Sequence, residues 1–70
     1  MNKDIFELKI MRIIALLEEA GYEPYTQLQS YVSLGNDSYI TRHGNARDRI
    51  KELEIQDIKE YLDGKMIWIV

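Results

Sequence analysis

The chain has no cysteine and only one histidine among its 70 residues. Without cysteine there is no disulfide framework, and one histidine alone cannot supply a zinc-type ligand set. No apolar run approaches the roughly 20 residues that a membrane-spanning helix needs, and the amino terminus lacks the successive segments of a signal peptide. We therefore expect a cytoplasmic protein that contacts no membrane, binds no metal and needs no cofactor.

An excess of basic residues is also missing, because the formal net charge is −3. Proteins that bind the nucleic acid backbone usually show a basic footprint, so nucleic acid is not the expected partner. The positive charge that is present gathers between residues 42 and 51, where Arg42, Arg47, Arg49 and Lys51 stand against Asp48. This asymmetry is the main electrostatic feature of the chain.

The chain is nevertheless rich in core-forming residues, with 46% hydrophobic side chains, which argues against disorder. A chain of this length forms one domain, residues 1–70, and buries only about 60% of the surface that its unfolded form exposes. Small domains without disulfides or metals commonly gain stability by oligomerisation. We therefore expect a single-domain homodimer.

The hydrophobic periodicity predicts an all-α fold of about four to five short helices. A first helix is expected from Asp4, as N-cap, to about Ala20, with Gly21 as the left-handed residue that closes it. Pro24 suits the first turn of a second helix that stops at Gly35.

Beyond the second helix the pattern is less regular. The segment 38–44 is expected to form a turn or a single helical turn, and Asn45 is expected to cap a third helix that bends or breaks near Glu54. Asp63 and Gly64 end the helical pattern. The uncharged, strand-like tail from Met66 to Val70 is expected to dock on another surface, such as the partner subunit.

The first predicted helix is apolar on more than one face. One face carries the spaced residues Phe6, Ile10, Ile13, Ile14 and Leu17. Because further apolar side chains lie elsewhere around the helix, one small core cannot cover them all. We therefore predict a homodimer interface that includes Ile5, Leu8, Met11, Ile13 and Leu16.

Enzyme chemistry lacks the necessary groups. His43 sits in a turn rich in glycine and arginine, with no cysteine to activate, and catalysis would require a poised partner. The pair Asn36-Asp37 lacks the alternating oxygen ligands of a calcium loop and fits a helix cap better. We expect no catalytic residues.

The basic segment is the candidate binding surface, with the expected partner-binding residues Tyr39, Arg42, His43, Asn45, Arg47 and Lys51. The planar guanidinium of arginine suits pairing with carboxylates or phosphates, which favours docking of an acidic or phosphate-bearing protein partner. Two alternatives remain open. The helix from Asn45 could contact DNA, although Asp48 would then face phosphates, or the arginines could form only salt bridges within or between subunits.

The residues also spell a familiar pattern at specific spacing: Gly21-Tyr22-Glu23-Pro24, Gln27, Tyr31-Val32, Gly35-Asn36, Tyr39-Ile40, Arg42-His43-Gly44-Asn45-Ala46-Arg47 and Ile50-Lys51. Over about residues 21–62 this pattern resembles the IreB/ReoM family without gaps. The resemblance implies a small helical homodimer of low-GC Gram-positive bacteria that acts in cell-envelope (peptidoglycan) control. It also implies a link to a PASTA-domain Ser/Thr kinase and to Clp-dependent turnover of an early peptidoglycan-synthesis enzyme.

The family's functionally important arginines correspond to Arg42 and Arg47 here, whereas Lys51 stands where an arginine is usual. The family's phosphoacceptor threonine lies ahead of the first helix, and this chain has no Thr or Ser before Thr26, so the phosphorylation site is not carried over. Thr41 replaces the usual proline and Ile55 replaces an arginine. Either the sequence is trimmed ahead of the first helix, or the chain is a divergent relative that has lost kinase control. The resemblance implies a Clp-type protease component or a Ser/Thr kinase as its partner.

Overall fold

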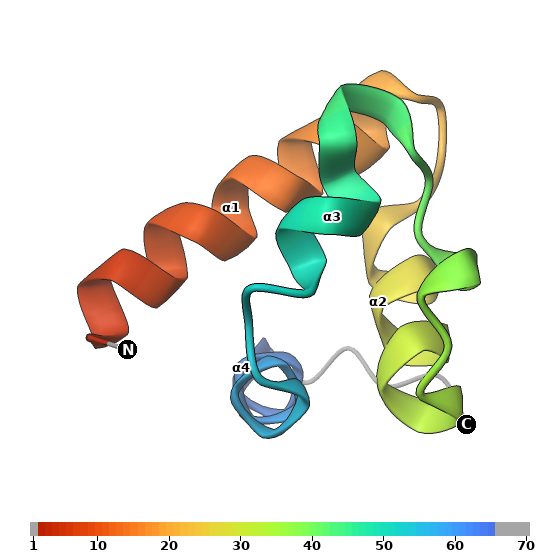
Figure 1. Cartoon of the computed structure of the whole chain (residues 1–70). Helices are drawn as coiled ribbons and strands as arrows, with labels where there is room; N and C mark the ends of the chain where they lie inside the picture. The colour runs from red at the N-terminus through yellow and green to blue at the C-terminus, as the bar shows by residue number, and fades with distance from the viewer. Residues whose placement is uncertain (1, 66–70) are drawn as a thin grey trace.

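The computed structural model describes residues 2–65 (Figure 1). This part of the chain contains four α-helices, two 3-10 helices and no strand, which confirms the predicted all-α fold. None of these helices is long and apolar enough to cross a membrane. The predicted apolar tail, residues 66–70, lies outside the described residues. The elements are α1 (Lys3–Glu19), α2 (Pro24–Leu34), η1 (Asp37–Tyr39), η2 (His43–Asn45), α3 (Ala46–Ile50) and α4 (Ile55–Lys65).

The N-cap of helix α1 lies two residues earlier than predicted. Asn2 is the N-cap, and its side-chain oxygen accepts a hydrogen bond of 2.7 Å from the backbone N–H of Asp4. Asp4 instead lies in the first turn, where its carboxylate interacts favourably with the positive end of the helix dipole. The carboxyl end is as predicted: Gly21 has a φ of 86°, and the Tyr22 N–H donates to the Leu17 carbonyl at 3.1 Å.

Helix α2 has the predicted bounds. Pro24 occupies its first turn, and the Glu23 carboxylate caps it by accepting hydrogen bonds from the N–H and the hydroxyl of Thr26, at 2.7 and 2.9 Å. Gly35, with a φ of 66°, ends it in the left-handed conformation. The helix is therefore specified at its amino end by side-chain capping and at its carboxyl end by a glycine backbone conformation.

The predicted third helix is two helices. α3 ends at Ile50, and the chain turns before α4 starts at Ile55, which confirms the predicted break near Glu54. Two details were wrong. Asn45 makes no side-chain cap hydrogen bond and instead has a φ of 62°, and α4 continues through Asp63 and Gly64 to Lys65.

The helices enclose one core. In Figure 1, α3 lies against α1, and α4 packs on α2. The buried apolar side chains come from every α-helix, from the connector between α2 and α3 and from the turn between α3 and α4. They are Phe6, Ile10, Ile13, Leu16, Leu17, Leu28, Tyr31, Ile40, Ala46, Ile50, Leu53, Ile58 and Leu62.

The core corrects the predicted dimer interface. Ile13 is fully buried and Leu16 is 4% exposed, so both belong to the core of their own chain and not to an outer face. α3 and η2 cover this part of α1, a long-range contact that helical periodicity alone does not reveal. The predicted interface is thereby reduced to the exposed apolar stripe of Ile5, Leu8 and Met11, which are 48%, 70% and 58% exposed.

Candidate functional site

The connector, residues 35–45 between α2 and α3, carries most of the predicted binding residues and is fixed to the core at two points. The Ile40 side chain is fully buried, and a Cβ placed on Gly44 would collide with the Leu16 side chain of α1. Gly44 has a φ of 59°, which favours glycine. The Thr41 N–H also donates a hydrogen bond to the Gln27 side chain of α2 at 3.2 Å. The connector therefore has a defined path.

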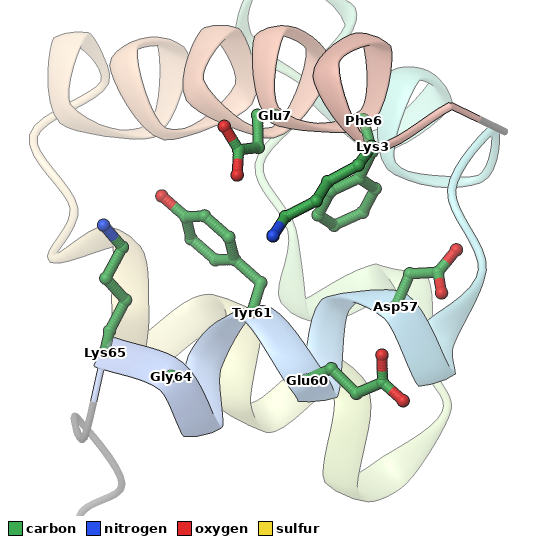
Figure 2. A pocket seen from close by; sticks show the side chains of 8 residues that line it. All are labelled: Lys3, Phe6, Glu7, Asp57, Glu60, Tyr61, Gly64 and Lys65. Carbon is green, nitrogen blue, oxygen red and sulfur yellow. The ribbon is translucent and has the colours of Figure 1, made fainter.

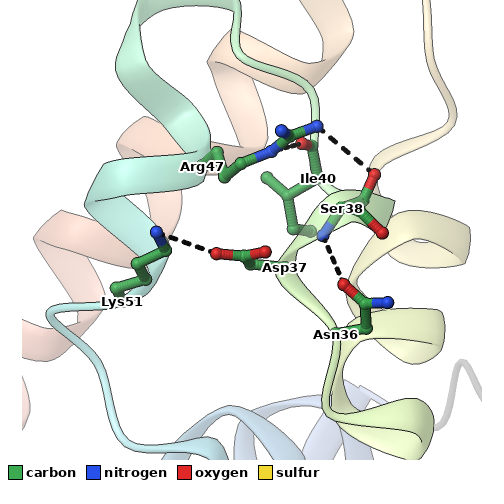
Figure 3. A network of polar contacts seen from close by, with 6 residues as sticks. All are labelled: Asn36, Asp37, Ser38, Ile40, Arg47 and Lys51. Carbon is green, nitrogen blue, oxygen red and sulfur yellow. Dashed lines mark hydrogen bonds and ion pairs between the residues drawn. The ribbon is translucent and has the colours of Figure 1, made fainter.

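Arg47 of α3 holds this path from the other side. Its Nε donates a hydrogen bond to the Ile40 carbonyl at 2.9 Å, and one Nη donates to the Ser38 carbonyl at 3.4 Å (Figure 3). The arginine thus provides hydrogen-bond donors for two connector carbonyls that lie beyond the end of α2. Arg47 therefore has partners within the chain, but they are carbonyl groups and not the acids that the salt-bridge alternative requires.

An ion pair closes the connector onto the end of α3. Lys51 Nζ lies 2.8 Å from a carboxylate oxygen of Asp37, and the two side chains are 54% and 35% exposed (Figure 3). This hydrogen bond, assisted by the charges of Arg47 and Arg42, holds the pKa of the Asp37 carboxyl below its ordinary value. The same bond raises the pKa of Lys51. Both groups are therefore charged at neutral pH.

A polar pocket of about 460 Å³ lies between the connector and α3 and is lined by Asp37, Arg42, Asn45, Arg47, Asp48 and Lys51. We call it the connector pocket. It contains four of the six predicted partner-binding residues. Tyr39 and His43 are exposed but do not line it.

The sequence reasoning missed Asp37 as a lining residue of the connector pocket, whereas Asp48 was already counted within the basic segment. Asp37 was interpreted with Asn36 as a helix cap, and Asn36 does cap η1, because its side chain accepts a hydrogen bond of 3.0 Å from the Ser38 N–H. The pairing of Asp37 with Lys51 joins residues far apart in the sequence. A count of local charge, restricted to residues 42–51, could not find it.

A second hollow runs between α1 and α4 and was not predicted. This α1–α4 groove has a volume of about 550 Å³ and an aromatic floor, because the rings of Phe6 and Tyr61 meet edge to face at 6.1 Å (Figure 2). The Lys65 ammonium lies 5.2 Å from the centre of the Tyr61 ring. Charges of both signs surround the floor, from Lys3, Glu7, Asp57, Glu60 and Lys65.

The candidate chemistry is therefore ionic recognition. Within residues 2–65 no group of three His, Asp or Glu side chains could hold a metal ion. The connector pocket instead brings the cations of Arg42, Arg47 and Lys51 into one small space, an arrangement suited to carboxylate or phosphate groups. Fold and site together define a small all-helical protein with a charged recognition pocket.

Comparison with known proteins agrees with this description. The model of the family described as IreB regulatory phosphoprotein matches residues 2–66. The chain therefore belongs to the IreB family, as its motifs indicated, and has the regulatory character of that family. No solved structure matches the chain.

Proposed function

We propose that this protein is a non-enzymatic regulator that binds a protein partner by docking an anionic group into the connector pocket. The observation that carries the proposal is the convergence of Arg42, Arg47 and Lys51 on one pocket of about 460 Å³. Ion pairs at a protein interface contribute to partner selection and association rate, which suits a regulator that engages its partner reversibly.

Arg42 is the residue most available to a partner. The arginine hydrogen bonds to the connector come from Arg47 and from Arg49, which donates to the Gly44 carbonyl at 3.1 Å. Arg42 takes part in none of these bonds, is exposed and lines the connector pocket. Tyr39 and His43, which are exposed on the same connector, are proposed to contact the partner outside the pocket.

The protein is further proposed to act as a homodimer, with a second copy covering the exposed apolar stripe of Ile5, Leu8 and Met11. Adjacent exposed apolar side chains on one helix are costly in water and are commonly covered by association. The connector pocket is built from α3 and the connector, so the stripe on α1 contributes none of its lining residues.

The resemblance supports a cellular setting for this activity. We propose a cytoplasmic role in peptidoglycan homeostasis of Gram-positive bacteria, downstream of a Ser/Thr kinase and linked to Clp proteolysis. A Clp-type protease component or a kinase-pathway protein is then the expected partner. DNA is not favoured, because α3 has only five residues and the chain carries a net charge of −3 instead of a basic footprint.

The test is affinity capture from a cytoplasmic extract with three proteins: the wild type, Arg42→Ala and Arg12→Ala. Arg12 is an exposed arginine of α1 outside the connector pocket, so its removal changes the net charge equally. Mass spectrometry should find the partner with the wild type and Arg12→Ala but not with Arg42→Ala, while circular dichroism shows equal helicity. Equal recovery by all three, or capture of nucleic acid alone, would refute docking through this pocket.

A further inference from the structure

The Asp37 carboxylate lies in the connector pocket, beside the basic residues that would contact a bound anion. It contacts Lys51 Nζ at 2.8 Å and shares the pocket lining with Arg42 and Arg47. The charges of all three basic residues lower the pKa of this carboxyl, so each is near enough to act on it. A group arriving from outside therefore meets a pocket that already contains one anion.

The backbone holds Asp37 in this place from both sides. Asn36 accepts the hydrogen bond that starts η1, and Arg47 binds the carbonyls of Ser38 and Ile40 that follow Asp37 (Figure 3). Asp37 is consequently presented to Lys51 by a short, pinned turn. The Asp37 carboxylate is held in the pocket by one exposed ion pair with Lys51. Such a pair is weak enough for another anion to replace Asp37.

Asp48 provides the contrast within the same pocket. Its carboxylate also lines the pocket, but among residues 2–65 it takes part in no ion pair within 4.0 Å, whereas Asp37 does. The two acids therefore have the same charge and a common pocket but differ in contact with a cation.

We propose that Asp37 is a built-in competitor that occupies, within the chain, the position of a phosphoryl group on the partner protein. The inference rests on the proposed docking function. A partner's anion has to displace Asp37 from Lys51 before it can engage all three cations. The affinity of the pocket is thereby set by an internal carboxylate as well as by the basic residues.

Charge complementarity selects a phosphoryl group over a single carboxylate. Once Asp37 has moved away, Arg42, Arg47 and Lys51 stand against Asp48, which leaves the pocket a charge of +2. A phosphorylated side chain carries about −1.5 to −2 at neutral pH and has three acceptor oxygens. A carboxylate from a partner would only replace one carboxylate by another, whereas a phosphoryl group adds a charge and an acceptor for Arg42.

The test uses three fluorescein-labelled peptides of one alanine- and glycine-rich sequence, with phosphothreonine, glutamate or threonine at the centre. Fluorescence anisotropy measures their binding to the wild type, Asp37→Asn, Asp48→Asn and Arg42→Ala at neutral pH and low salt. Asp37→Asn should bind the phosphopeptide about two- to fivefold more tightly than the wild type, the range expected from releasing one exposed ion pair. Asp48→Asn, with the same charge change, should tighten binding by a smaller factor.

The outcomes separate the competitor from the docking function. If Arg42→Ala weakens binding but Asp37→Asn binds no more tightly than Asp48→Asn, the competitor is refuted and the docking function stands. If none of the four proteins binds the phosphopeptide or the glutamate peptide, docking fails and the competitor falls with it. Equal tightening for the glutamate and phosphothreonine peptides would overturn the preference for a phosphoryl group.

A second measurement follows Asp37 itself. In isotopically labelled wild type, the nuclear magnetic resonance signal of the Asp37 carboxyl reports its pKa, which Lys51 now keeps low. Saturation with the phosphopeptide should raise that pKa toward the ordinary aspartate value, because the peptide takes over Lys51. An unchanged titration at saturation would show that the peptide binds without displacing Asp37 and would overturn the proposal.

Discussion

Replacing Gly44 by alanine should destabilise the fold more than the same substitution at any other glycine of the chain. Two costs combine at this position. The backbone has a φ of 59°, a conformation that costs a residue with a side chain about 1–2 kcal/mol. The new Cβ would also collide with Leu16, which is only 4% exposed and cannot move into solvent. Overcrowding a packed site typically adds about 1–3 kcal/mol.

The expected loss for Gly44→Ala is therefore about 2–5 kcal/mol, a large share of the stability of a small domain. Two other glycines separate the contributions. Gly35 has a φ of 66°, but no atom lies within 4 Å of the point where a Cβ would stand, so Gly35→Ala should cost only the backbone part, about 1–2 kcal/mol. Gly64 lies within α4 in open space, and Gly64→Ala should stabilise the protein by about 0.5 kcal/mol.

Urea unfolding followed by circular dichroism gives these free energies, with all variants at one protein concentration because association would add to the apparent stability. The variant Leu16→Ala supplies the decisive comparison. It removes the atoms that Gly44→Ala would strike, so the cost of Gly44→Ala should fall to that of Gly35→Ala in this background. Equal costs for Gly44→Ala and Gly35→Ala in the wild-type background would refute the close approach of η2 to α1.

Three further predictions concern the surface. Leu8→Glu should convert the proposed dimer to a monomer in analytical ultracentrifugation, whereas Leu34→Glu, at a similarly exposed leucine of α2, should not. The folded pKa of Asp37 is lowered, so its ion pair stabilises the fold above the unfolded value of about 3.9 and loses that effect as pH falls through the folded pKa. The difference in thermal midpoint between wild type and Asp37→Asn should therefore vanish in acid. Arg47→Lys keeps the charge but not the planar donor pair, and should lower the free energy of unfolding by about 1–2 kcal/mol in urea titrations.

The helix ends show what local sequence could predict. Pro24 and Gly35 bound α2 as expected, because a fixed φ and a left-handed residue act within one turn. The same local reasoning placed the cap of α1 at Asp4 when Asn2 makes the hydrogen bond. Both residue types are good caps, so residue type alone does not decide between them.

The dimer face shows where periodicity was insufficient. Ile13 and Leu16 were assigned to an interface because the apolar residues of α1 exceed one stripe. The count overlooked that α3 and η2 cover a second face of α1 from within the chain. Only Ile5, Leu8 and Met11, toward the amino end of α1, stay exposed. A chain of short helices can therefore cover more than one face of a long one.

The binding site shows the same limit in its electrostatics. Local composition singled out the basic segment, and Arg42, Asn45, Arg47 and Lys51 of that segment line one pocket. Composition could not distinguish Arg42, which is exposed, from Arg47, which is hydrogen-bonded to the connector. That difference arises from where two carbonyl groups of the connector point, and no residue type encodes it directly.

The shape of the connector pocket depends on the core, because the connector that lines it is anchored there. Ile40 is buried among the helices and Gly44 rests on Leu16, so the core holds the connector on both sides of Arg42, and Asp37 lies three residues before Ile40. Arg47 then joins that segment to α3. Loss of function at Arg47 would therefore report a displaced connector as well as a missing charge, whereas loss at Arg42 with unchanged stability would report the charge alone. The roles of Arg42 and Arg47 look equivalent in the sequence, and they can be distinguished by measuring both the free energy of unfolding and partner binding for each variant.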